Sequence, residues 1–236
     1  MLESFVVTME MYRRAFSRGA VLAAKNWPVL VSIFAYAGIL FVGALLAMQL
    51  GMAGGLLLSL LRAACLASFL YLVEQIVCSG KVSVADFRRS FGVYLWDVVG
   101  VSFVIWIFAM LTTLIAQSTP NGAVIVLCVN LVALVFFNAV PELIYLGHSG
   151  AVALLSRSYE FITANWIEWF PPNLLLLGGL AAIWLLIPAH EPVLAVVRWA
   201  ATALFLYFAM VVRGLLFIEL DGSTRRARLF RHKMGR

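Results

Sequence analysis

The chain has 236 residues, of which 64% are apolar and only 12% are charged, and its formal net charge is +6. Soluble domains are nearer to half apolar and a quarter charged, so this composition excludes an ordinary water-soluble domain and predicts a compact polytopic membrane protein. The spacing of the three cysteines fits no metal-binding motif, and we expect Cys65, Cys78 and Cys128 to be small apolar packing residues.

The segment before the first long apolar run predicts an amphipathic helix. Its apolar side chains recur at helical spacing, and its charged side chains fall elsewhere on the helical wheel. The apolar positions are Leu2, Phe5, Val6, Met9, Tyr12 and Phe16. Such a helix can lie in the membrane interface, and Trp27 suits the point where the chain goes into the bilayer, because its ring is apolar and its N–H is polar.

Six apolar stretches follow, and a bilayer span needs roughly 20 such residues. They cover approximately residues 28–50, 53–77, 98–116, 123–146, 173–190 and 193–218. Pro141 removes a backbone donor from the fourth stretch and predicts a kink beside Glu142. The fifth stretch is the weakest because its uninterrupted apolar run, from Leu174 to Ile187, is short. It is a tilted, thinned or partly re-entrant span, or alternatively a buried soluble helix.

The positive charges outside the apolar stretches all fall on one side of the predicted membrane. Lys and Arg precede the first stretch, occupy the connections after the second and fourth, and fill the tail, whereas the three alternate connections carry none. By the positive-inside rule, both termini and the long connections are cytoplasmic, and an even number of spans gives the same orientation.

Tryptophan recurs about every seventy residues, at Trp27, Trp96 and Trp166, each where a polar or amphipathic stretch turns apolar. The first and third copies also share a Ser-Arg pair and an Asn-Trp pair at identical spacing, within 17–27 and 156–166. We therefore predict one membrane domain of three parallel repeats, each an amphipathic cytoplasmic interfacial helix followed by a two-span hairpin. The repeats cover about 1–78, 79–148 and 149–222, with a basic cytoplasmic tail at 223–236. Chance recurrence of tryptophan at membrane interfaces is the alternative.

The third copy carries a family resemblance. Its motifs are Pro141-Glu142-Leu143-Ile144-Tyr145, Gly150-Ala151-Val152-Ala153-Leu154, Ser156-Arg157-Ser158-Tyr159-Glu160-Phe161 and Asn165-Trp166. They resemble a broad group of bacterial six-span membrane proteins, related to the membrane domain fused to some glycerophosphodiester phosphodiesterases. The resemblance implies an all-α fold and a multi-pass location in the bacterial inner membrane, and it implies no reaction.

Ionisable and amide side chains within the spans form a candidate polar site, because a charge inside a bilayer usually faces protein or water. The candidates are Arg62, Glu74, Asn130, Glu142 and Arg213. Counting along each span places Arg62 and Asn130 near the midplane, and the other three at equivalent depths near the cytoplasmic face. A ligand pathway between the hairpins is one interpretation, and a structural pair that fixes helix packing is the other.

The basic tail is expected to contact anionic lipid, at about 1 kcal/mol per charge near the surface. Its basic residues include Arg225, Arg226, Arg228, Arg231 and Lys233. The sequence carries no zinc-protease, phosphate-loop or nucleophile-elbow motif, so we expect no enzyme, metal or cofactor. It favours a non-catalytic scaffold or accessory module that engages lipid, a partner protein or a second copy of itself, and not nucleic acid. A small transporter or channel is the first alternative, and a membrane-embedded enzyme is the second.

Overall fold

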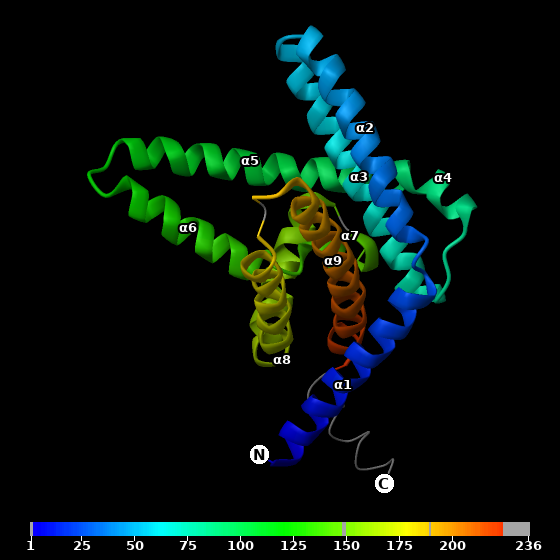
Figure 1. Ribbon diagram of the computed structural model, residues 1–236. Helices are drawn as coiled ribbons and strands as arrows, with labels where there is room; N and C mark the ends of the chain where they lie inside the picture. The colour runs from blue at the N-terminus through cyan, green and yellow to red at the C-terminus, as the bar shows by residue number, and fades with distance from the viewer. Residues whose placement is uncertain (1, 148–149, 189, 224–236) are drawn as a thin grey trace. The chain divides into compact units, whose positions relative to one another are not determined.

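The computed structural model describes residues 2–147, 150–188 and 190–223, and every regular element within these ranges is an α-helix (Figure 1). In chain order they are α1 (Leu2–Lys25), α2 (Val29–Gln49), α3 (Met52–Ser79), α4 (Val84–Val93), α5 (Leu95–Gln117), α6 (Gly122–Phe136), α7 (Val140–Leu146), α8 (Ala151–Leu186) and α9 (Pro192–Asp221). Six helical segments in this part of the chain are long and apolar enough to cross a membrane. The predicted all-α polytopic membrane bundle is confirmed.

The observed segments match the predicted spans within a few residues, except for the fifth. We expected that span at 173–190, but α8 is helical from Ala151 to Leu186, with one departure from helical geometry at Asn165. The helix passes through Pro171 and Pro172 instead of beginning after them. It ends before Pro188, because the residue that precedes a proline is disfavoured in the α conformation.

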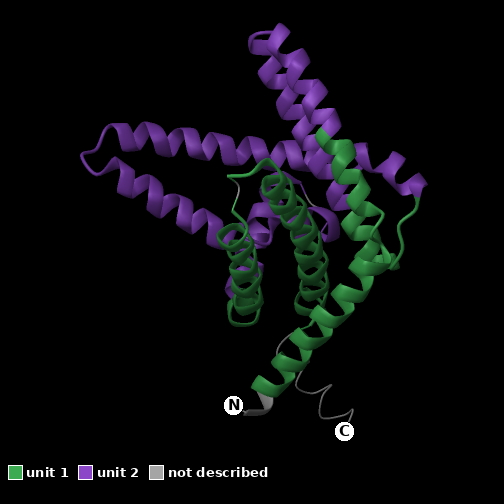
Figure 2. Ribbon diagram, in the orientation of Figure 1, with its two compact units in different colours: residues 1–37, 72–83, 165–236 green, residues 38–71, 84–164 purple. Residues whose placement is uncertain are grey.

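The described chain forms two compact units (Figure 2). Unit 1 comprises the described residues within 1–37, 72–83 and 165–236, and unit 2 comprises the described residues within 38–71 and 84–164. The helices α2, α3 and α8 each contribute residues to both units. The predicted boundaries of the three repeats stay a prediction.

Two tight turns in unit 2 depend on glycine. The turn between α2 and α3 brings Gly54 so close to the carbonyl of Ala47 that an added Cβ would lie 2.0 Å from the oxygen. The turn between α5 and α6 repeats this arrangement, since a Cβ added at Gly122 would lie 2.0 Å from the carbonyl oxygen of Ala116. Only a residue without a side chain fits either place, so each glycine fixes the close return of its hairpin.

Unit 1 is held by a seam between α1 and α9. The side of α1 that is buried carries small or slender side chains at every fourth position, which are Val7, Met11, Ala15, Gly19 and Ala23. Gly19 lets the helices approach, since a Cβ there would lie 2.6 Å from a methyl carbon of Val212.

The apolar stripe that we predicted for α1 divides between two environments. Phe5, Val6 and Met9 are exposed, which leaves their side chains available to a lipid interface. Phe16 instead packs against Phe208 of α9, with ring centroids 6.2 Å apart. The stripe is therefore not the principal protein-facing side of the helix.

Asn26 ties three parts of unit 1 together. Its buried side-chain amide donates to the carbonyls of Leu22 and Gly80, at 2.9 and 3.2 Å, and its side-chain oxygen accepts the N–H of Val82 at 3.0 Å. The Tyr207 hydroxyl of α9 donates to the Asn26 carbonyl at 3.1 Å. These hydrogen bonds hold the turn after α1 against the connection after α3 and against α9.

Candidate functional site

Each of the three predicted interfacial tryptophans lies within a break in helical geometry or one or two residues after it. Trp27 lies in the turn between α1 and α2, Trp96 follows Tyr94 (φ −108°, ψ 11°), and Trp166 follows Asn165 (φ −125°, ψ 16°). Their side chains are exposed, at 62%, 75% and 58% respectively. The chain therefore changes direction where each ring becomes available to its surroundings, an arrangement that supports the prediction that these residues are membrane anchors.

The fourth span is interrupted at 137–139, immediately before Pro141. The Val140 N–H, which an unbroken helix would direct to Phe136, donates to the carbonyl of Phe137 instead. The kink that Pro141 predicted is confirmed. Glu142 follows in the first turn of α7 and is 0% exposed, so the break places a carboxyl group in the interior of unit 2.

The Ser-Arg-Ser sequence of α8 contacts both ends of α7. Ser158 donates its hydroxyl to the Phe136 carbonyl at 2.7 Å, which replaces the helical donor lost at the break. Arg157 donates to the Gly147 carbonyl, just beyond the end of α7, at 3.0 Å. The motif that carries the family resemblance therefore has a structural task in this chain, because it satisfies backbone carbonyls within the apolar region.

Arg213 of α9 belongs to a polar and aromatic cluster inside unit 1. Its guanidinium donates to the side-chain oxygen of Asn173 at 2.9 Å and lies 5.2 Å from the ring centroid of Trp169. Trp169 is fully buried and meets Phe217 edge to face, with centroids 6.3 Å apart. A guanidinium on an aromatic face within about 6 Å is attracted to the ring electrons.

Pro172 explains a hydrogen bond between α1 and α8. Proline has no N–H, so the carbonyl of Glu168, four residues earlier, loses its helical donor. Tyr12 of α1 donates its hydroxyl to that carbonyl at 2.8 Å. Sequence reasoning missed Trp169, Asn173 and this bond, although a double proline inside an apolar run was a visible signal that a backbone acceptor required a partner from elsewhere.

The remaining predicted site residues are distributed between the units. Arg62 and Asn130, in unit 2, are both exposed and form no hydrogen bond among the described residues. Glu74 and Arg213 belong to unit 1, and Glu142 belongs to unit 2. The polar site that we predicted from these five residues stays a prediction. Among the described residues no three His, Cys, Asp or Glu side chains are grouped so as to hold a metal ion.

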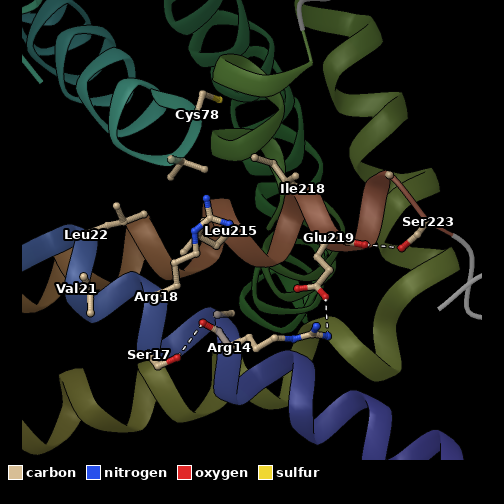
Figure 3. A pocket seen from close by; sticks show the side chains of 13 residues that line it. Arg14, Ser17, Arg18, Val21, Leu22, Cys78, Leu215, Ile218, Glu219 and Ser223 are labelled. Atoms are coloured by element: carbon tan, nitrogen blue, oxygen red, sulfur yellow. Dashed lines mark hydrogen bonds and ion pairs between the residues drawn. The ribbon is translucent and has the colours of Figure 1, made fainter. Parts of the chain in front are cut away.

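Unit 1 also contains a groove that the sequence did not reveal (Figure 3). It has a volume of about 1040 Å³ and lies between α1, the C-terminal end of α3 and the C-terminal end of α9. Its apolar lining includes Val21, Leu22, Val77, Leu215 and Ile218, and its polar lining includes Arg14, Ser17, Arg18, Glu219 and Ser223. We call it the α1–α9 groove.

The two arginines of the groove differ in their partners. Arg14 forms an ion pair with Glu219, with 3.2 Å between the guanidinium nitrogen and the carboxylate oxygen. Their side chains are 65% and 33% exposed, so this pair contributes little to stability. Arg18, one helical turn later, reaches from α1 into the groove in Figure 3 and has no ion pair or hydrogen bond among the described residues.

The predicted lipid-binding tail, including Arg225, Arg226, Arg228, Arg231 and Lys233, lies outside the described residues. Comparison of the chain with family models, with curated proteins and with solved structures finds no match. The protein is a multi-pass membrane protein by its six long apolar helices.

Proposed function

We propose that this membrane protein is a non-catalytic accessory module that holds lipid, or a partner protein, at the cytoplasmic face of a bacterial inner membrane. The observation that carries the proposal is the exposure of Trp27, Trp96 and Trp166, each at the break that precedes an apolar span. Exposed tryptophan at such junctions is typical of the headgroup level of a bilayer. The helices that precede the breaks are then surface elements, available to bind.

The charge pattern supports the same proposal. The basic residues Arg18, Arg88 and Arg89 are exposed and lie on α1 and α4, the helices that precede the first two tryptophans. A basic surface beside apolar anchors attracts anionic headgroups. The resemblance to bacterial six-span membrane proteins is consistent with a location in the bacterial inner membrane, and it implies no catalysed reaction.

The test is purification of the protein from its native membrane under mild conditions, followed by identification of bound lipid and protein. A photo-crosslinker at Val84, an exposed position of α4, should capture the partner, whereas one at Met52, in the predicted outer turn, should not. The variants Trp27→Leu and Trp96→Leu should weaken retention, and Trp106→Leu, an exposed tryptophan within α5, is the matched control. A protein that carries neither lipid nor partner would contradict the proposal.

A second function is favoured by one observation, the interrupted fourth span with Glu142 buried at its break. Broken helices beside a buried carboxyl group are found in ion-coupled transporters. The wild-type protein and Glu142→Gln should then differ in proton or cation flux across proteoliposomes. Equal flux, at the level of protein-free vesicles, would leave the accessory function.

A further inference from the structure

The α1–α9 groove has the chemistry of a site for a molecule that is apolar at one end and anionic at the other. Apolar side chains, among them Val21, Leu22 and Leu215, line it together with two arginines, one glutamate and two serines. A volume of about 1040 Å³ exceeds what a small inorganic ion requires and lies at the upper end of the range of small-molecule pockets. We propose that this groove binds an anionic phospholipid, with Arg18 as the principal contact to the phosphodiester.

Arg18 is the arginine of the groove whose guanidinium has no other partner among the described residues. Arg157 holds the corresponding place in the other Ser-Arg pair, and its guanidinium donates a hydrogen bond to the Gly147 carbonyl. Arg14 is occupied by Glu219. Arg18 has five N–H donors and no partner among the described residues, so a phosphate oxygen bound there gains charge-assisted hydrogen bonds without breaking one.

The position of the groove favours a lipid over a soluble anion. It lies at the ends of α3 and α9, which are both candidate spans, and α1 leads from it to the exposed Trp27. These elements place the groove at the level of the headgroups, so acyl chains extend along Val77 and Leu215 while the phosphodiester meets Arg18. The chain then continues from Ser223 into a tail rich in arginine.

The electrostatic balance of the groove permits this occupant. Its ionised side chains are Arg14, Arg18 and Glu219, which leave one net positive charge. The C-terminal dipoles of α3 and α9 oppose an anion, but hydrogen bonds cover several of their last carbonyls. Ser223 donates to the carbonyl of Glu219, and Ser79 donates to that of Gln75. The guanidinium of Arg18, which has no partner among the described residues, is therefore the dominant charge in the lining of the α1–α9 groove.

This assignment rests on the proposed function and is tested separately from it. The purified protein in a neutral detergent is titrated with phosphatidylglycerol or with phosphatidylcholine, and bound lipid is counted by native mass spectrometry. We expect wild type to prefer phosphatidylglycerol and Arg18→Gln to bind it about tenfold more weakly, since hydrogen bonds to charged groups are the strong ones. Arg18→Lys should retain part of the preference.

Arg13→Gln is the matched control, because it removes the same charge from an exposed position of the same helix outside the groove. If Arg18→Gln and Arg13→Gln lose phosphatidylglycerol binding equally, the lipid is held by general electrostatic attraction to α1. That result would overturn the assignment. Leu22→Trp, which fills the apolar part, should weaken both lipids, and it keeps the test decisive if Arg18→Gln does not fold.

Three further outcomes would overturn the assignment. Complete displacement of the lipid by inorganic phosphate would mean that the groove takes a free anion. An acidic peptide that loses binding in Arg18→Gln, while phosphatidylglycerol binding is unchanged, would mean that the occupant is a protein. If the protein retains a native partner but shows no preference for anionic lipid, the proposed function stands and only the assignment of lipid to the groove is refuted.

Discussion

The bond between Tyr12 and the carbonyl of Glu168 makes a quantitative prediction. Tyr12→Phe keeps the aromatic ring and removes only the hydroxyl, which lies 2.8 Å from that oxygen. This length is typical of a good O–H···O bond, and the bond is partly buried. A single neutral hydrogen bond contributes about 1 kcal/mol, and bonds between membrane helices are no stronger on average. We expect Tyr12→Phe to lower the free energy of unfolding by about 1 kcal/mol.

Pro172→Ala turns this expectation into a double-mutant cycle. Alanine restores a backbone N–H four residues after Glu168, so the carbonyl regains its helical donor. In that background the cost of Tyr12→Phe should shrink toward zero, because the hydroxyl no longer supplies the missing bond. The free energy of unfolding is measured in mixed micelles by far-ultraviolet circular dichroism, for the wild type, both single variants and the double variant.

Tyr159→Phe is the control for the loss of a hydroxyl. The Tyr159 ring packs against Phe136, with centroids 5.0 Å apart, and its hydroxyl has no hydrogen bond among the described residues, so this variant should be nearly neutral. The reasoning fails if Tyr12→Phe costs the same whether residue 172 is proline or alanine. It also fails if the two tyrosine variants are equally stable.

Three other predictions follow from the turns, the Asn26 network and the charge distribution. Gly54→Ala should cost about 1–3 kcal/mol by forcing a backbone shift, whereas Gly55→Ala, which meets nothing within 4 Å, should cost none; comparative thermal denaturation in micelles distinguishes them. Asn26→Ala should destabilise by about 2 kcal/mol, because it removes three hydrogen bonds at a buried position, and a neutral result in the same assay would refute that network. In a variant without native cysteines, Met52→Cys should react with an impermeant thiol reagent from outside the cell and Arg88→Cys only after permeabilisation; the reverse pattern would invert the predicted topology.

The spans could be predicted from sequence because hydropathy over some twenty residues is a local property of the chain. The positions of Trp27, Trp96 and Trp166 also followed from local composition, and the structure adds that each one lies within or just after a helix break. The kink near Pro141 was local as well, since a proline acts on its own helix.

The protein-facing side of α1 was not predictable in the same way. The large apolar side chains and the small residues of α1 both recur at helical spacing. The large side chains are more hydrophobic, so they determine which face the sequence predicts to be buried. The close approach of Val212 to Gly19 shows which side of α1 lies nearest to α9.

The continuity of α8 through Pro171 and Pro172 was hidden for a different reason. Proline ordinarily ends a helix, and here the lost bond is replaced by Tyr12, which is 156 residues away in the chain from Glu168. The α1–α9 groove was missed for a related reason, because its lining comes from three distant segments.

The support of α7 by Ser158 has a consequence for the order of assembly. During synthesis the fourth span is made before α8, so the Phe136 carbonyl lacks its hydroxyl donor until Ser158 has been added and can reach it. The fourth span therefore reaches its final geometry only after the chain has begun α8. A nascent chain truncated before residue 158 should carry a fourth span whose break is still open to water or to a neighbouring lipid headgroup.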